Sequence, residues 1–437
     1  MRVLQIGRDD WSAALHLPAG VDWSFVDADD AASFDADLVG RTDVTVVDAL
    51  AGPGNLAALD RVITPYTLLV ARHLRDGFDE SGRAFLARKA AVFEDVVDRQ
   101  ALVDSLPRRF FARQFGQKLE VRRALVSPFH HGDHAYEGSA CLTVPIAGQE
   151  ELRQLVTWKE NIAYDAARPL ELWPEFVADP GCEVELVLQL IQSGTPDVTV
   201  FHRRYTQEQL AEPILVDDPT SGYLVCSIFA RGTGTVNVGP IHYRHSRLGS
   251  GHFLPGGRRI VDSRREELFT YFHPGNLTPP FNVYFAGYRP AEGFEGFFMM
   301  AGLGQPFLLV TDPRLEGGRF YLGSEELEGK LMEVIRGHVR DLGFTEEDVI
   351  FSGLSMGSFG ALYYGSQLRS HAIVAGKPII DLGYVAERGR LVRPREFFTV
   401  FDLVNFWDGS VRSDRAKDVH EFTRLLLDRW RGRALST

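Results

Sequence analysis

Cysteine is scarce in this sequence. Three cysteines, Cys141, Cys182 and Cys226, occur in 437 residues. Being odd in number and widely scattered, they predict neither a disulfide framework nor a zinc site. No stretch approaches the roughly 18 to 20 consecutive apolar residues that span a bilayer. Arg2 and Arg8 interrupt the N-terminus, which predicts that no signal peptide is present. These absences favour a cytoplasmic protein without a cofactor.

An excess of positive charge is also missing. Lys and Arg number 47 against 59 Asp and Glu, which gives a net charge of −12 with neutral histidines. This balance argues against nucleic acid or an anionic membrane as the main partner. Hydrophobic residues make up 45% of the chain, as in a soluble globular protein. At about 150 residues per domain, the length corresponds to roughly three domains.

Residues 1–115 alternate between short apolar runs and stretches that suit helices. The runs, each short enough for a buried strand, are 3–7, 44–47, 67–70 and 90–93. Residues 51–62 between them predict a helix. The alternation favours a small Rossmann-like α/β domain with a mainly parallel sheet. Gly7 is a lone glycine and gives no dinucleotide-binding fingerprint, so we expect a scaffold or partner surface.

The pattern changes over residues 118–275. Apolar residues recur at every second position in 184–190 and 224–228, and Val236 and Val238 follow the turn-like Gly232-Thr233-Gly234. Short alternating strands separated by turn residues predict an antiparallel β-sandwich. Such a domain commonly binds another domain or a ligand, carbohydrate included.

Residues 276–437 return to the α/β pattern. Apolar runs at 282–285, 307–310 and 348–351 predict strands, and residues 327–342 have the apolar spacing of a helix. The last predicted strand leads directly into Gly353-Leu354-Ser355-Met356-Gly357, a G-x-S-x-G sequence. Together these features predict a C-terminal α/β-hydrolase-like catalytic domain.

The G-x-S-x-G sequence indicates a nucleophile elbow, because a strand precedes it and a helix can follow. In such a strained turn the hydroxyl of Ser355 points outward, and a side chain at Gly353 or Gly357 would collide with neighbouring backbone. Ser355 is therefore the candidate nucleophile. The backbone N–H of Met356, at a helix N-terminus, is a candidate oxyanion donor. The alternative is a tight strand-to-helix turn with a buried serine.

A second oxyanion donor is expected in the loop after an earlier strand. Gly287 follows the predicted strand 282–285, and its missing side chain allows close approach to a substrate. We assign it that role, with a plain turn as the alternative.

The base is harder to place. The order in this fold is serine, acid, histidine, and two histidines follow Ser355. His371 begins the next predicted strand, which is too early. His420, on a polar helix face, is the candidate general base, with a solvated residue as the alternative. No final strand and helix are evident before Thr437, so the catalytic domain reads as truncated. The candidate acids, none of them favoured, are Asp381, Asp402 and Asp408.

Two histidine-containing stretches have other interpretations. Residues 130–134 hold three histidines and Asp133, as some metal sites do. No second cluster follows at a plausible spacing and the spacing is not H-E-x-x-H, so we predict an exposed loop and no metal. Residues 242–247 are basic and aromatic. They could meet sugar hydroxyls or pair with acidic neighbours, and the second interpretation is favoured.

Several stretches resemble one known family, in the same order and over nearly the whole chain. The strongest is NVYFAGYRPAEGFEG at 282–296. The others are 3–7 with Trp11, 239–244, 312–318 and 353–357. The chain thereby resembles the second accessory secretory proteins of the accessory Sec system of Gram-positive bacteria.

This resemblance implies an α/β-hydrolase-type O-acetyltransferase that modifies N-acetylglucosamine on glycosylated serine-rich adhesins. Ser355 matches the family's nucleophile. The family's acid and histidine lie in a C-terminal segment that begins about where this chain ends, so they are not carried over. The implied partners are other accessory secretion proteins, the accessory translocase motor and the adhesin. Membrane association would come only through those partners.

Two alternatives remain beside acetyl transfer. The missing base favours a non-catalytic export chaperone or adaptor, in which the first two domains contact the cargo and its secretion partners. A carboxylesterase unrelated to secretion is the remoter alternative, and it would hydrolyse soluble esters without a glycoprotein.

Overall fold

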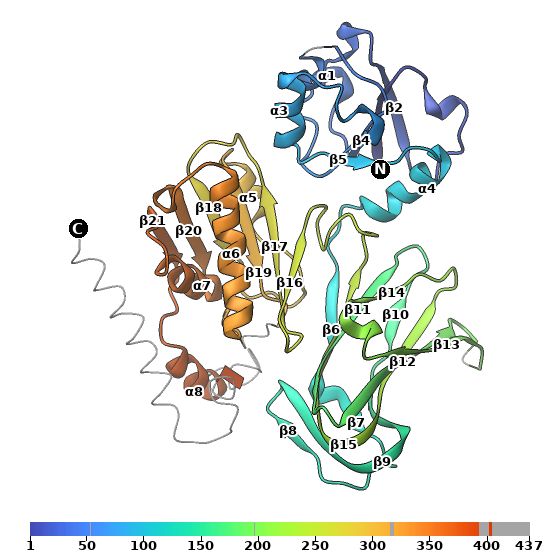
Figure 1. The fold of residues 1–437 in the computed structure, drawn as a ribbon, viewed down its shortest axis with the longest axis vertical. Helices are drawn as coiled ribbons and strands as arrows, with labels where there is room; N and C mark the ends of the chain where they lie inside the picture. Colours follow the sequence, from blue (N-terminus) through green and yellow to red (C-terminus); the bar gives the residue numbers. More distant parts are fainter. Residues whose placement is uncertain (53, 196, 315–318, 393–401, 404–437) are drawn as a thin grey trace, which may run out of the picture.

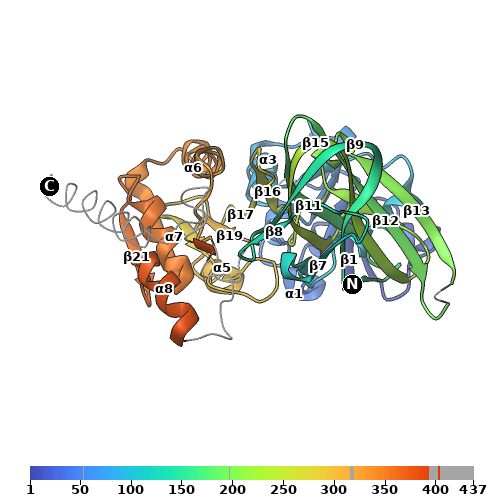
Figure 2. The ribbon, with the colours of Figure 1, turned by 90° about the horizontal axis from the view of Figure 1, so that it is seen from below.

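The computed structural model describes residues 1–52, 54–195, 197–314, 319–392 and 402–403. Over these residues the chain is a mixed α/β protein with three sheets, which confirms the fold class at that level. Figure 1 shows the first sheet at the top, the second at the lower right and the third at the left. Seen from below in Figure 2, the third sheet and its helices lie beside the second. No helix in this part of the chain is both long and apolar enough to span a membrane.

Five parallel strands form the first sheet, in the order β2-β1-β3-β4-β5. The carboxyl ends of parallel strands lie at one edge of a sheet, which is where open α/β sheets bind ligands. The strands are β1 (Arg2–Gly7), β2 (Asp22–Asp27), β3 (Val44–Val47), β4 (Leu68–Ala71) and β5 (Val92–Glu94). The helices are α1 (Ala36–Val39), α2 (Asn55–Ala58), α3 (Glu80–Arg88) and α4 (Arg99–Arg109).

Two elements of this sheet differ from the sequence prediction. The sequence does not predict β2, because its side chains are mostly exposed or half-buried at the sheet edge. The helix expected over 51–62 is confined to the four residues of α2. Gly54, with a φ of +78°, holds the chain out of the helical region just before Asn55, and residues 59–62 form turns.

Ten antiparallel strands form the second sheet, which surrounds one apolar core. The sequence predicts a sandwich for this region, whereas the strands belong to a single hydrogen-bonded sheet. They are β6 (Gly116–Leu119), β7 (Ala124–Val126), β8 (Ala135–Glu137), β9 (Cys141–Trp158), β10 (Ile162–Tyr164), β11 (Leu170–Ala178), β12 (Cys182–Gln192), β13 (Thr199–Thr206), β14 (Ile214–Val216) and β15 (Gly222–His245).

The central strand β15 runs for 24 residues and pairs with five others. Gly232-Thr233-Gly234 therefore does not form the turn that the sequence predicts. Gly232 and Gly234, with φ of +110° and +144°, lie where the register with β9 shifts, so they form bulges inside one strand. Bulges bend a strand and increase its twist, which lets a long sheet close over a core.

Six strands form the third sheet, in the order β16-β17-β19-β18-β20-β21. β17 pairs antiparallel with both of its neighbours, and β19, β18, β20 and β21 are mutually parallel. The sheet begins before residue 276, in the stretch that the sequence analysis places in the sandwich. The strands are β16 (Arg258–Val261), β17 (Glu267–His273), β18 (Phe281–Phe285), β19 (Phe307–Thr311), β20 (Val349–Leu354) and β21 (Ala372–Gly376).

Helices cover this sheet on both sides (Figure 1). The longest, α6, follows Ser324, whose hydroxyl accepts the N–H of Leu327 at 3.1 Å and so caps the helix. Leu331, Ile335 and Val339 form its buried stripe, at the spacing predicted from the sequence. The helices are α5 (Phe297–Ala301), α6 (Glu325–Asp341), α7 (Met356–Gly365) and α8 (Leu382–Val392).

Direct side-chain contacts join the three sheets. Arg247, 1% exposed, follows β15 and donates to two carbonyl oxygens, each at 2.9 Å. One belongs to Arg109, the last residue of α4, and the other to Phe111 just after that helix. Tyr66, which precedes β4, packs its ring 5.7 Å from that of Tyr271 in β17. The third sheet is therefore held against both of the others.

Candidate active site

Ser355 forms a sharp turn between β20 and α7. Its φ of +54° and ψ of −119° lie in a region that residues with side chains rarely occupy. The backbone N–H of Ser355 donates to the carbonyl oxygen of Gly376 at the end of β21, at 2.8 Å. This is the strained strand–turn–helix geometry of a nucleophile elbow.

Glycine is required on both sides of this serine. A Cβ at Gly353 would lie 2.1 Å from the carbonyl oxygen of Gly357. A Cβ at Gly357 would lie 2.1 Å from the carbonyl oxygen of Phe285 in β18. Both distances are far below any van der Waals contact, which confirms the predicted collision. The elbow therefore packs directly against the end of β18.

Ser358 ties the next loop to the elbow. Its buried hydroxyl donates to the carbonyl oxygen of Ser355 and accepts the N–H of Ile379 at 2.9 Å. Because Ile379 lies in the segment after β21, one hydroxyl fixes the turn and the neighbouring loop together.

Gly287 lies beside the elbow, in the loop after β18. A Cβ on it would lie 3.2 Å from the carbonyl oxygen of Leu354, the residue before the nucleophile. Its N–H donates to Oε2 of Glu295 at 2.6 Å. The sequence predicts the position of this loop but not that bond, because nothing in the local pattern marks Glu295 as the acceptor. Met356, the other candidate donor, is the first residue of α7.

A buried ionic network holds the far end of this loop. Oε1 of Glu292 lies 2.6 Å from Nδ1 of His242, and its Oε2 accepts Nε of Arg244 at 2.6 Å. Nε2 of His242 lies 2.9 Å from Glu175 in β11. Arg244 also pairs with Glu267 of β17. The network was not predicted, although the pairing of residues 242–247 with acidic neighbours is confirmed.

Charge explains the protonation of this network. Burial alone would lower the pKa of His242, but the carboxylates of Glu292 and Glu175 outweigh it and raise that pKa to about 9. Burial likewise tends to raise the pKa of Glu292, and Arg244 and His242 together bring it below its usual value. At neutral pH an imidazolium therefore lies between two carboxylates.

Hydrogen bonds from the segment before β6, from β6 itself and from β19 also hold this loop. Gln114 accepts the N–H of Phe294 at 2.7 Å and donates to its carbonyl oxygen at 3.1 Å. Gly116 accepts the N–H of Glu292 at 2.9 Å. Thr311 donates its hydroxyl to the carbonyl oxygen of Gly293 at 2.9 Å. Residues 292–294 are thus fixed from several directions.

A polar pocket of ≈ 200 Å³ adjoins the candidate oxyanion loop. It lies where β6 of the second sheet faces the loops after β18 and β19. Gly287 belongs both to the wall of this pocket and to the surroundings of the elbow. The other described lining residues are Gln117, Lys118, Glu120, Arg289, Pro290, Ala291, Glu292, Thr311, Asp312 and Pro313.

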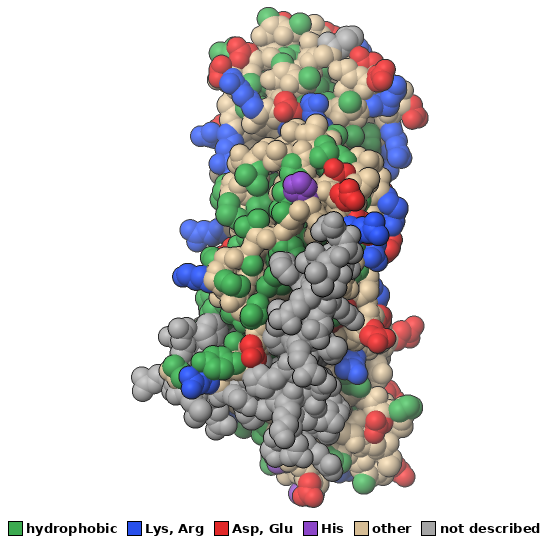
Figure 3. All heavy atoms as spheres, turned by 90° about the vertical axis from the view of Figure 1, so that its left-hand side faces the viewer, with side chains coloured by type: hydrophobic (Ala, Val, Ile, Leu, Met, Phe, Trp, Pro, Cys, Tyr) green, Lys and Arg blue, Asp and Glu red, His purple; other side chains and the backbone are tan. Residues whose placement is uncertain are grey.

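Exposed apolar side chains occur on β20, on β21 and in the segment after β21, close to the elbow in the sheet. Leu354, Val374 and Ile380 are 46%, 59% and 46% exposed. Figure 3 views the molecule from the side on which β21 lies and shows apolar side chains gathered at mid-height. Exposed apolar area beside a nucleophile is suited to contact with a substrate or a partner.

The predicted acids and bases are not brought to Ser355 by any hydrogen bond among the described residues. His420 and Asp408 lie outside those residues. His371 immediately precedes β21, at the opposite end of that strand from the elbow, as expected. Asp381 accepts the N–H of Tyr384 near the start of α8, at 2.8 Å.

Asp402 docks against the second sheet. Both of its carboxylate oxygens lie 3.0 Å from the N–H of Ser139, in the turn between β8 and β9. Burial raises its pKa to about 6. This carboxylate is therefore engaged in joining the C-terminal region to the second sheet.

Residues 130–134 form a loop in which His131, Asp133 and His134 are exposed, as predicted. Across the described part of the chain no group of His, Cys, Asp and Glu side chains could hold a metal ion.

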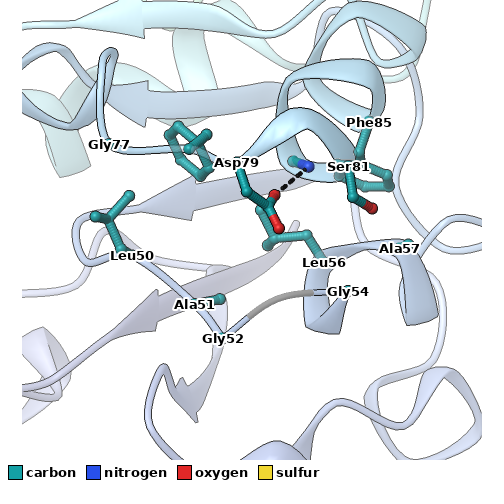
Figure 4. A pocket seen from close by; sticks show the side chains of 12 residues that line it. Leu50, Ala51, Gly52, Gly54, Leu56, Ala57, Gly77, Asp79, Ser81 and Phe85 are labelled. Atoms are coloured by element: carbon teal, nitrogen blue, oxygen red, sulfur yellow. Dashed lines mark hydrogen bonds between the residues drawn. The ribbon is translucent and has the colours of Figure 1, made fainter.

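A second pocket, of ≈ 190 Å³, lies at the carboxyl ends of β3 and β4 in the first sheet (Figure 4). Leu50, Leu56 and Phe85 are among its apolar walls. Asp79, the single charged residue among the described lining residues, accepts the N–H of Gly82 at 2.7 Å and so caps α3. The charge that the described lining residues carry is thus negative, which does not favour a phosphate, and a scaffold or partner role for this sheet stays a prediction.

Comparison with known proteins relates nearly the whole chain to one family. The family model described as "Accessory Sec system GspB-transporter" matches residues 1–431. An accessory Sec system protein of Staphylococcus aureus (strain NCTC 8325 / PS 47), from this same family, is 38% identical over 417 residues, which cover 92% of this chain and 79% of that protein. Its namesake in Streptococcus gordonii is 36% identical over 410 residues, or 93% and 80% of the two chains.

A solved structure is similar along nearly the entire chain. A chain of the Glycosylation Associate Protein (Gap123) complex from Streptococcus agalactiae is 32% identical and superposes with a TM-score of 0.88. The match covers 98% of this chain and 85% of that one.

Proposed function

Because the chain belongs to the accessory Sec system GspB-transporter family, we propose that it serves adhesin export and O-acetylates the adhesin glycans through Ser355. The single observation that carries the enzymatic part is the strained turn at Ser355. Its neighbouring glycines are required by contacts under 3 Å. A serine held in this way has its hydroxyl directed out of the turn, which a merely structural serine does not need.

The sheet around Ser355 supports the same proposal. β20 lies between β18 and β21, so the elbow follows an inner strand, and the loop with Gly287 follows the adjacent strand. That is the relationship of nucleophile and oxyanion loop in an α/β-hydrolase. We therefore propose an α/β-hydrolase-like catalytic domain.

The chemistry would proceed in two steps. In the first, the oxygen of Ser355 attacks the carbonyl carbon of an acetyl donor, a base takes the serine proton, and the leaving group departs with that proton. In the second, a glycan hydroxyl attacks the acetyl-serine and passes its proton to the base. The serine oxygen then leaves the acetyl carbon, and the base returns the proton to it, which restores the serine. The N–H groups of Met356 and Gly287 would stabilise the oxyanion of each step. His420 remains the candidate base.

The similar chain in the Gap123 complex supports other accessory secretion proteins as partners. We propose the serine-rich adhesin and the translocase motor as further partners. The chain would meet them in the cytoplasm.

The enzymatic part is tested by incubating purified protein with an activated acetyl ester between pH 6 and 9, followed by mass spectrometry of the peptide that contains Ser355. We expect an acetyl adduct on Ser355 in the native protein and none in Ser355→Ala. Ser366→Ala is the matched control, because that hydroxyl donates to the carbonyl oxygen of Tyr363 at the far end of α7. Absence of the adduct at every pH would contradict the proposal.

A non-catalytic adaptor is the second candidate. Among the described residues no hydrogen bond joins the Ser355 hydroxyl to a histidine. If the chain is an adaptor, cells that carry Ser355→Ala should still export the adhesin. The acetylation level of the adhesin glycans in these cells should also stay unchanged. Loss of glycan acetylation with export maintained would instead assign Ser355 to the enzyme.

A further inference from the structure

We infer that Glu295 controls the oxyanion site: its carboxylate holds the N–H of Gly287 in the resting molecule and must turn away before an acyl group reacts at Ser355. This inference rests on the proposed function of Ser355 and deepens it, because it names a residue that sets the rate at which the site becomes available.

The contact is a short, charge-assisted hydrogen bond. Oε2 of Glu295 lies 2.6 Å from the nitrogen of Gly287, and bonds from an N–H to a carboxylate are among the stronger ones in proteins. Gly287 lies against Leu354, immediately before the nucleophile. The carboxylate therefore occupies the anion position of the candidate oxyanion donor.

Two anions cannot share this donor. A backbone amide has one hydrogen to donate. The tetrahedral intermediate carries its negative charge on the oxygen that would need the same N–H, and like charges repel strongly in a partly desolvated site. Acyl transfer with Gly287 as donor thus requires Glu295 to withdraw.

The backbone just before Glu295 is held in place and does not provide that movement. Glu292 is held by His242 and Arg244, and Phe294 by two hydrogen bonds to Gln114. The mobile part is consequently the side chain of Glu295, which is only half-buried. Rotation of one side chain is faster than the rearrangement of a loop.

Tyr284 offers the displaced carboxylate a second donor. Burial and the charge of Glu295, to which it is hydrogen-bonded, raise the pKa of Tyr284 to about 12. The phenol therefore keeps its proton at neutral pH and can continue to donate to Glu295 after Gly287 is released. The carboxylate need not become isolated when the site opens.

The test uses Ser355→Cys, because a thiol reacts without the unassigned base. Acetylation of Cys by an activated ester passes through an oxyanion, whereas alkylation by iodoacetamide does not. The rate of acetylation divided by the rate of alkylation therefore measures how well the donor stabilises the oxyanion. Changes in thiolate concentration affect both rates and cancel in this ratio. We compare Ser355→Cys alone with Ser355→Cys combined with Glu295→Ala, Glu295→Gln or Glu292→Gln.

We expect Glu295→Ala to raise the ratio about tenfold, a change of about 1.4 kcal/mol in the barrier. Glu295→Gln should give a smaller rise, because its amide oxygen still accepts the N–H without a charge. Glu292→Gln should lower the ratio by loosening the loop. An unchanged or lower ratio in Glu295→Ala would overturn the inference and make Glu295 a positioning residue for the loop. The two proposals can fail separately. If Glu295→Ala raises the ratio but Ser355 of the native protein is never acetylated, the control by Glu295 is supported and the proposed function is contradicted.

Discussion

The imidazole of His242 lies 2.6 Å from the carboxylate of Glu292, and this pair joins the second sheet to the loop beside Ser355. His242 belongs to β15, the central strand of the second sheet. Glu292 belongs to the loop that presents Gly287 to the elbow. The second sheet is therefore a structural component of the candidate active site.

Replacing the histidine should destabilise the fold. His242→Phe removes the hydrogen bonds that this ring makes to Glu175 and Glu292, and of the side-chain partners of Glu292 among the described residues Arg244 remains. Breaking a buried ion pair costs about 3 to 5 kcal/mol, and we expect a loss near the lower end in urea unfolding at pH 7. His202→Phe, at an exposed position on β13, is the control and should change stability by less than about 0.5 kcal/mol. Equal effects of the two changes would show that the network contributes nothing.

The same histidine makes stability depend on pH. Its pKa is raised from 6.5 to about 9 in the folded protein. The native state therefore binds the proton more tightly than the unfolded state, and this stabilisation is complete below pH 6.5 and lost as pH rises through 9. Unfolding free energies measured between about pH 6 and 9.5 should fall more steeply in the native protein than in His242→Phe. Parallel curves would contradict the assignment of a protonated His242.

A methyl group at Gly357 should disrupt the elbow. The added Cβ of Gly357→Ala would meet the carbonyl oxygen of Phe285 at 2.1 Å. Backbone must move to relieve this, at a cost of about 1 to 3 kcal/mol, and acetylation of Ser355 should be lost. Gly329→Ala is the matched control, because nothing lies within 4 Å of its Cβ on α6. That change should stabilise the helix by up to about 1 kcal/mol.

Ser358→Ala should loosen the loop after β21 without touching a substrate. It leaves the N–H of Ile379 without its acceptor, which costs about 1 to 3 kcal/mol when the donor is buried. Hydrogen exchange at the Ile379 amide should accelerate, and the rate of Ser355 acetylation should fall. Unchanged exchange at Ile379 in this variant, compared with Ser366→Ala, would be incompatible with the bond.

The ionised carboxylate of Asp402 should weaken the docking of its segment on the second sheet at neutral pH. Burial raises its pKa from 3.8 to about 6, so ionisation opposes the folded arrangement above pH 6 and no longer does so below 3.8. Asp402→Asn keeps an acceptor for the N–H of Ser139 without a charge. It should slow proteolysis of this segment at about pH 7.5 and have little effect near pH 4. Faster proteolysis of the variant at the higher pH would show that the charged form is the better partner.

The elbow could be predicted from sequence because its determinants are local. Ser355, its two glycines, the preceding strand and the following helix are consecutive, and each restricts the backbone at its own position. The same holds for α6, whose buried stripe repeats within one helix. Strand β15 shows where local reasoning fails, because the glycines at 232 and 234 fit a turn or a bulge equally well, and pairing with β9 decides between them.

The residues that hold the oxyanion loop could not be found in this way. His242, Glu292 and Gln114 are distant in sequence, and each resembles an ordinary surface residue when taken alone. Charged side chains are normally exposed, so their burial together follows from tertiary packing that the sequence pattern does not encode. Glu295 is equally inconspicuous until its contact with Gly287 is known.

One loop of the third sheet is held by four residues that precede that sheet in the chain: Gln114, Gly116, His242 and Arg244. This limits how the chain can be divided into fragments. A fragment that starts at β16 would contain Ser355 and every strand of the third sheet, yet it would lack all four of these residues. Its carboxylates at Glu292 and Glu267 would lose their buried cationic partners His242 and Arg244. The third sheet and the residues of the second sheet that hold its loop should accordingly be expressed and engineered as one unit.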